Sequence, residues 1–135
     1  MANALYDKAR ESFLKGEINF TSNNIKAMLA DSALYTPNLA THQFLTDIPS
    51  GARVAISANM ASKTTAAGVA DCADFSFTTV TGAVCAYVVF YQDTGSAATS
   101  RLICCEDTAT NLPLTPNGAD IDVVIDSGAN KLFKL

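Results

Sequence analysis

The sequence has few charged residues, and this scarcity excludes two broad classes of protein. Charged residues make up 16% of the 135 residues, whereas 49% are hydrophobic. Disordered chains combine low hydrophobicity with high net charge, so we expect this chain to fold. Nine basic residues stand against thirteen acidic ones, giving a net charge of −4. Because nucleic-acid affinity depends largely on basic residues that neutralise phosphates, DNA and RNA are poor candidate partners.

Long apolar runs are also missing. No window approaches the roughly 18 apolar residues of a membrane span, and the first ten residues carry charges where a signal peptide needs an apolar stretch. We therefore expect no membrane partner, and a chain that is made in a cytoplasm and stays there. In a reducing compartment its cysteines are thiols that act as small hydrophobic residues. The four cysteines are Cys72, Cys85, Cys104 and Cys105.

Motifs for catalysis and for cofactor binding are absent from the sequence. There is one histidine, His42, and no Cys-x-x-Cys pair, so a typical zinc site lacks its ligands. There is no glycine-rich dinucleotide motif, phosphate loop or Gly-x-Ser-x-Gly elbow. Asp120, Asp122 and Asp126 alternate with apolar residues, which is typical of a solvated strand face and not of a calcium loop. We expect no catalytic residue, no cofactor and no metal site.

The strongest hint of an enzyme is a pair of Asp-Ser/Thr-Gly triplets. Residues 123–129 are similar to the active-site run of aspartic proteases, and Asp93-Thr-Gly offers a second copy. However, only nine residues follow Asp126, and Asp93 lacks an apolar lead-in. Both triplets are also ordinary turn sequences. We favour turns at both positions and keep a small aspartic-type hydrolase as a distant alternative.

Hydrophobic periodicity predicts one helix at the N-terminus. Leu5, Ala9 and Phe13 share one helical face, with Asn3 as a candidate N-cap and Gly16 as a candidate stop. We therefore predict a helix of about three turns within residues 1–16.

The segment that follows begins with a strand and continues as a structured connection. Ile25, Ala27 and Leu29 alternate at period two, which predicts a strand. Within residues 35–49, Pro37 and Pro49 bracket a stretch in which Asn38 is a candidate cap for a short helix holding Leu39 and Phe44.

From residue 51 onward the pattern is that of strands and turns. Residues 84–91 and 101–105 are almost continuously apolar, which indicates strands buried on both faces. Residues 131–135 are expected to form a last strand. The chain is thus predicted to be all-β: a single-domain antiparallel β-sandwich over residues 23–135 with one short N-terminal helix. Its predicted core includes Phe75, Phe77, Val88, Phe90, Leu102, Ile121, Val123 and Ile125.

Residues 58–81 are rich in alanine and threonine and carry few charges. Such small side chains form flat strands and loops that another subunit can approach closely. The alternative is that they merely fill a thin sandwich. The sequence leaves both interpretations open.

Several runs of the sequence resemble a family of small structural proteins of tailed bacteriophages. The similarity lies in residues 4–19, 25–31, 35–55, 93–103, 112–121 and 128–135, and so covers most of the chain. It is a similarity of the whole chain and not of a catalytic signature. It implies a virion protein without enzymatic activity, most naturally a capsid cement or decoration protein on the capsid surface. A head–tail connector, neck or tail protein is the alternative.

The resemblance implies the major capsid protein and further copies of this chain as partners. A symmetric trimer matches threefold or quasi-threefold positions of a capsid and multiplies weak contacts. Terminal segments reach a neighbour most easily, so one of the two ends is expected to contact another subunit. The alternative is that both ends close the protein's own sandwich. The candidate contact residues are Leu5, Ala9, Phe13, Leu132, Phe133 and Leu135.

Overall fold

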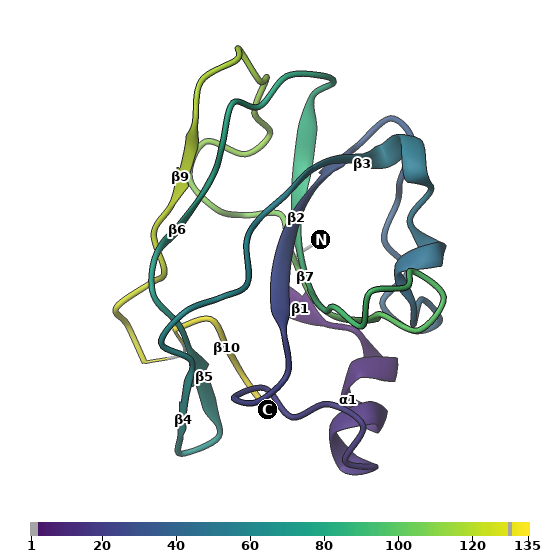
Figure 1. Cartoon of the computed structure of the whole chain (residues 1–135), viewed down its shortest axis with the longest axis vertical. Helices are drawn as coiled ribbons and strands as arrows, with labels where there is room; N and C mark the ends of the chain where they lie inside the picture. The colour runs from purple at the N-terminus through teal and green to yellow at the C-terminus, as the bar shows by residue number, and fades with distance from the viewer. Residues whose placement is uncertain (1–2, 130) are drawn as a thin grey trace.

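A five-stranded antiparallel sheet forms the centre of the fold (Figure 1). The computed structural model describes residues 3–129 and 131–135. The strand order is β1-β8-β7-β2-β3. The bounds are β1 Ala4–Leu5, β2 Ile25–Asp31, β3 Arg53–Ile56, β7 Cys85–Gln92 and β8 Arg101–Glu106. The predicted strand at residues 25–29 and the two long apolar strands are therefore confirmed.

Two smaller antiparallel sheets cover one face of the central sheet. One has the order β10-β5-β4 and the other pairs β6 with β9. In Figure 1 these strands lie on the left of the view, beside β2 and β7. Their bounds are β4 Thr64–Ala66, β5 Val69–Asp71, β6 Phe75–Phe77, β9 Ile121–Val123 and β10 Phe133–Lys134. The architecture confirms an all-β fold with one short N-terminal helix.

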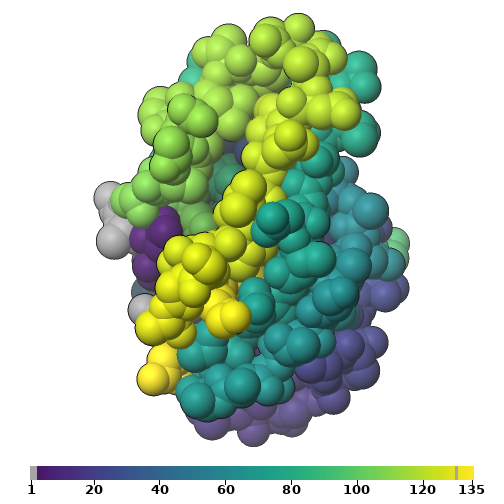
Figure 2. Space-filling model, turned by 90° about the vertical axis from the view of Figure 1, so that its left-hand side faces the viewer, coloured from purple at the N-terminus to yellow at the C-terminus, as the bar shows by residue number. Residues whose placement is uncertain are grey.

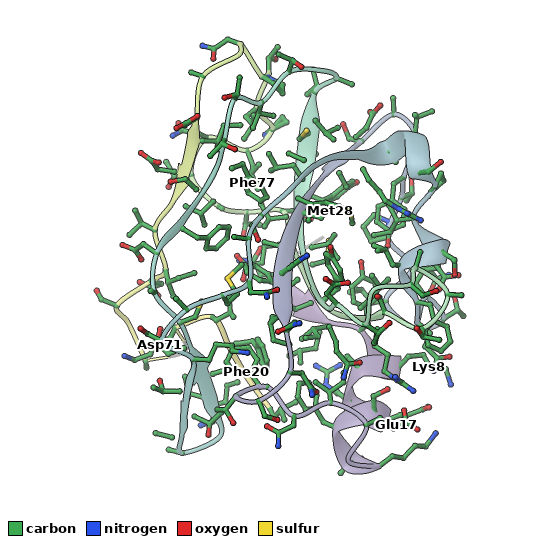
Figure 3. The ribbon with its side chains drawn as sticks, in the orientation of Figure 1. Lys8, Glu17, Phe20, Met28, Asp71 and Phe77 are labelled. Atoms are coloured by element: carbon green, nitrogen blue, oxygen red, sulfur yellow. The ribbon has the colours of Figure 1, made fainter. Side chains whose placement is uncertain are left out.

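Successive side chains of the central strands point alternately into two hydrophobic cores, so the central sheet is buried on both faces. Leu29 and Phe90 face the small sheets, where Phe77 packs against them in one core. Met28 and Val89 belong to the second core, on the opposite face. Figure 3 shows Phe77 between β6 and the central strands. Continuous apolar runs are what a strand with two buried faces requires.

The predicted core residues all contribute to packing, but to different degrees. Four of them are buried and four are half-buried. Phe77, Val88, Phe90 and Leu102 are buried. Phe75, Ile121, Val123 and Ile125 are partly buried against the first core.

The helix is shorter than predicted and starts later. Helix α1 spans Asp7–Leu14, about two turns, whereas Leu5 lies in β1 and is paired with Cys104 of β8. Asn3 does not cap the helix, because its Oδ1 accepts hydrogen bonds from the N–H groups of Asp107 and Thr108. These partners lie more than a hundred residues away in the sequence. Residues 1–2 of the predicted helix lie outside the described residues.

The predicted end of the helix at Gly16 is correct. Gly16 has a φ of +72°, in the region that glycine adopts without strain, and its N–H donates to the Phe13 carbonyl.

The connection between β2 and β3 is structured, but its helical turn lies later than predicted. Asn38 closes a turn by accepting from the N–H groups of Ala40 and Thr41. The first 3-10 turn, η1, spans Leu45–Asp47, and the second, η2, spans Ser50–Ala52. Asn38 thus caps the turn at residues 39–41, whereas the carboxylate of Asp47, the third residue of η1, accepts from the backbone N–H groups of Gln43 and Phe44 before η1.

Candidate functional site

Most of the candidate contact residues are packed within the chain itself. Leu5 and Ala9 are buried in the two cores, and Leu132 and Phe133 are buried in the first core. Phe13 is half-buried, with its ring 6.0 Å from that of Phe133. This arrangement agrees with the alternative in which both ends close the protein's own sandwich. Among the six candidates, Leu135 is the exposed one, with 58% of its surface accessible.

Leu135 borders a surface that we name the terminal face. It consists of the β4–β5 hairpin at residues 64–68, Leu135, and an apolar groove of about 360 Å³ between them and residues 16–21. Figure 1 shows the hairpin and the C-terminus at the same end of the molecule. Phe20, Val69 and Phe133 line the groove. The hairpin residues 64–68 are two threonines, two alanines and a glycine, all exposed, so the hairpin presents small, uncharged residues.

The two aspartate triplets lie in different surroundings. The Asp93 carboxylate pairs with Lys26 Nζ at 2.7 Å and accepts from the Gly95 N–H. The hydrogen bond from Lys26, and then that from Gly95, lower the pKa of Asp93. Asp126 instead lines a cleft whose lining does not include Asp93. The pair of carboxylates sharing one proton that an aspartic protease needs is therefore not formed by these two residues.

His42 belongs to a hydrogen-bond chain that enters the second core. Its Nδ1 accepts from the Asn38 N–H at 3.1 Å and lies 3.0 Å from the Tyr35 hydroxyl. The Tyr35 hydroxyl is in turn 2.8 Å from that of Tyr6, which is fully buried. Because Nδ1 accepts a backbone N–H, the ring proton is assigned to Nε2. These hydrogen bonds anchor the connection at residues 35–49 to Tyr6, the residue that follows β1 of the central sheet.

The cysteines are buried free thiols, as predicted. Burial, and then the nearby Asp71, raises the pKa of Cys72 to about 11, and burial raises that of Cys85 to about 11. A thiol with a raised pKa is a poor nucleophile near neutral pH. Within residues 3–129 and 131–135, no three His, Cys, Asp or Glu side chains are grouped to hold a metal ion.

A larger opening, the interlayer cleft, lies between the central sheet and the C-terminal strands. Its volume is about 1200 Å³. One wall includes β1, the middle of β7 and the end of β8, and the other includes residues 121–127 and 131–134. Figure 2 faces this side of the molecule, where the C-terminal segment runs diagonally between residues of the 100–118 region and the β4–β6 region.

Glu106, at the end of β8, lines the interlayer cleft and is half-buried. Burial raises the pKa of its carboxyl group to about 7. The sequence showed no sign of this group, because its environment depends on strands that are far apart in the chain. Asp122 and Asp126 line the same cleft, so two of the three aspartates predicted to lie on a solvated face border an opening between layers.

A scan of the chain against protein-family models gives no match, and a search of curated proteins gives none either. No helix within the described part of the chain is long and apolar enough to cross a membrane.

Proposed function

We propose that this chain is a structural protein of a tailed-bacteriophage virion, and specifically a capsid cement or decoration protein. In this role it binds the assembled lattice of the major capsid protein and stabilises it. The observation that carries the proposal is the terminal face, an uncharged hairpin and an apolar groove that end at the exposed Leu135. Its small side chains allow a neighbouring subunit to approach closely, and exposed apolar patches mark interaction sites.

The proposal needs no catalytic group. Several charged side chains serve structural ion pairs, such as Lys26 with Asp93 and Arg101 with Glu17. The resemblance of the sequence to phage structural proteins points in the same direction. A trimer at threefold or quasi-threefold positions is part of the proposal, since it would present three terminal faces to the lattice at once.

The test uses capsid shells purified from a phage lacking the gene, to which the recombinant protein is added. We expect saturable binding and a higher melting temperature of the shells. Leu135→Asp places a charge on the terminal face and should weaken binding about tenfold or more, because burial of a leucine side chain contributes about 1.5–3 kcal/mol.

Leu34→Asp is the matched control, because Leu34 is similarly exposed (57%) but does not line the groove. Equal binding by both variants, or no binding by the wild-type protein, contradicts the proposal.

A connector, neck or tail position remains the second candidate. Antibody labelling of intact particles separates the two. Label over the whole capsid supports a cement protein, and label confined to the neck or tail supports the alternative.

A further inference from the structure

Two strand edges border the interlayer cleft without a partner strand. β1 is the last strand of the central sheet, and β9 pairs with β6 alone among the described strands. Residues of both strands line the cleft. In an antiparallel strand, successive backbone groups alternate in direction, so part of the β9 backbone points away from β6. An unpaired edge of this kind is a template for a further strand.

The floor of the cleft is apolar and suits alternating side chains. Its accessible apolar side chains are the half-buried Ile121 and Val123 of β9 and Leu112 and Leu114 of the loop after β8, above the buried Phe90 and Cys104 of the central sheet. Its volume of about 1200 Å³ lies above the range of about 300–1,000 Å³ that is usual for small-molecule sites. The size and the strand edges together favour an extended peptide segment over a small ligand.

The lining of the cleft holds four carboxyl groups and three basic side chains, and one of the carboxyl groups, that of Glu106, has a pKa of about 7 and is only partly ionised near neutral pH. The carboxyl groups are those of Asp74, Glu106, Asp122 and Asp126, and no ion pair within the described parts of the chain involves them. Two of the basic residues in the lining have acidic partners outside it. Arg10 pairs with Asp7 at 3.0 Å, and Lys131 pairs with Asp71 at 3.0 Å.

This leaves Lys134 as the remaining basic side chain of the lining. The net charge of the chain is −4, so a second copy is electrostatically disfavoured as the occupant and a basic segment is favoured.

We propose that the interlayer cleft receives an extended basic segment of a partner protein, which adds a strand between β1 and β9. Alternate side chains of the segment point into the apolar floor, and the basic residues between them face the acidic lining. Backbone hydrogen bonds supply affinity and the alternate pockets supply specificity, as in other cases of strand addition. That the partner is the capsid subunit rests on the proposed function, whereas the choice of a basic extended segment rests on the cleft.

The probe is a capped hexapeptide of alternating lysine and valine, about 20 Å long when extended. Amide signals of the isotopically labelled full chain are followed by NMR during the titration. We expect shifts and slower hydrogen exchange in residues 4–5 and 121–125. A glutamate–valine hexapeptide should bind at least about tenfold more weakly, because its charges repel those of the lining. Equal binding of both peptides, or shifts confined to other surfaces, overturns the proposal.

Two further comparisons test the backbone and charge contributions. A lysine–valine peptide with N-methylated valines cannot donate those backbone hydrogen bonds and should lose measurable binding. Asp126→Lys in the cleft lining should weaken binding about two- to fivefold at low salt, as expected for an exposed charge. Glu11→Lys on α1 is the control, because Glu11 is absent from the lining, and it should leave binding unchanged. Undiminished binding of the methylated peptide overturns strand addition.

The peptide assay does not depend on capsids, so the two proposals can fail separately. If the protein binds the shells but the lysine–valine peptide does not bind in the cleft, the cleft proposal alone is overturned. Peptide binding in the cleft without shell binding overturns the proposed function alone. Concentration-dependent shifts of the same cleft residues without peptide would show that a second copy enters, and would overturn the choice of a basic partner.

Discussion

At the scale of single residues, polar side chains fasten irregular segments to the sheet. His42 shows this best, because its Nδ1 joins the Asn38 N–H and the Tyr35 hydroxyl, and the latter reaches the buried Tyr6. In the sequence, His42 stands out only as a lone histidine without the further ligands of a zinc site. Its partners could not be predicted, because they depend on how residues 35–49 fold back on the sheet.

Replacing the His42 ring tests this role. His42→Leu removes the acceptor and should lower the free energy of unfolding by about 1–2 kcal/mol, since it leaves polar groups without their partner. His42→Asn places an oxygen near the position of Nδ1 and should recover about half of the loss. Urea unfolding of the three proteins measures both effects. A leucine variant as stable as the wild type would contradict the anchoring role.

Glu106 should make stability depend on pH. Burial raises its pKa from 4.5 to about 7 in the folded protein, so the folded state binds more protons than the unfolded state between these values. The contribution of this group to stability therefore falls as pH rises from about 4.5 to about 7, and is constant above.

Glu106→Gln keeps the shape of the side chain and removes this titration. The free energy of unfolding of the variant minus that of the wild type should increase by about 1–3 kcal/mol from about pH 5 to about pH 8. Urea unfolding at both pH values provides the measurement. A difference between the two proteins that does not change with pH would show that Glu106 titrates normally.

At the scale of elements, the first and last strands, β1 and β10, are held in the fold in the same way. β1 and β10 are two-residue strands, and each is held by side chains buried in the first core. Local hydrophobic patterns were sufficient to predict three strands, alternation at residues 25–29 and continuous apolar runs at residues 84–91 and 101–105, because each strand buries its own side chains. They failed at Asn3 and Leu5, where pairing with a strand a hundred residues away overrides the local helical pattern.

Phe133 of β10 and Leu135, which follows the strand, should differ sharply in their effect on stability. Phe133 is buried and its ring lies 5.6 Å from that of Phe20, whereas Leu135 is exposed. Phe133→Ala should cost about 3–5 kcal/mol, the usual value for a buried phenylalanine, and Leu135→Ala less than about 0.5 kcal/mol. Thermal and urea unfolding test this. Similar losses in both variants would mean that the end of the chain is not packed as described.

The same packing gives an expectation for truncation. Deleting residues 1–16 removes buried Leu5 and Ala9, and deleting residues 131–135 removes buried Leu132 and Phe133. Each deletion should therefore unfold or strongly destabilise the protein. If a truncated chain still folds, as shown by a cooperative thermal transition, the deleted end is not needed for the fold and is again a candidate for contacts with another subunit.

At the scale of the whole molecule, the fold places two interaction surfaces at different sites. The terminal face joins a hairpin of small, uncharged residues to an apolar groove, and the interlayer cleft has four carboxyl groups among its lining. Composition left open whether residues 58–81 form a low-charge surface or fill the sandwich, and the exposed hairpin at residues 64–68 agrees with the first interpretation. The cleft escaped prediction because its walls come from β1, β8 and β9, which only the tertiary structure brings together.

The central claim is that the protein binds the capsid lattice through its terminal face. The most direct measurement is a cryo-electron-microscopy reconstruction of purified particles, compared with particles lacking the gene. We predict additional density over the whole capsid at threefold or quasi-threefold positions, into which the sandwich fits with Leu135 and the β4–β5 hairpin against the lattice. Density confined to the neck or tail, or capsid density that contacts the lattice only through surfaces other than the terminal face, would contradict this account.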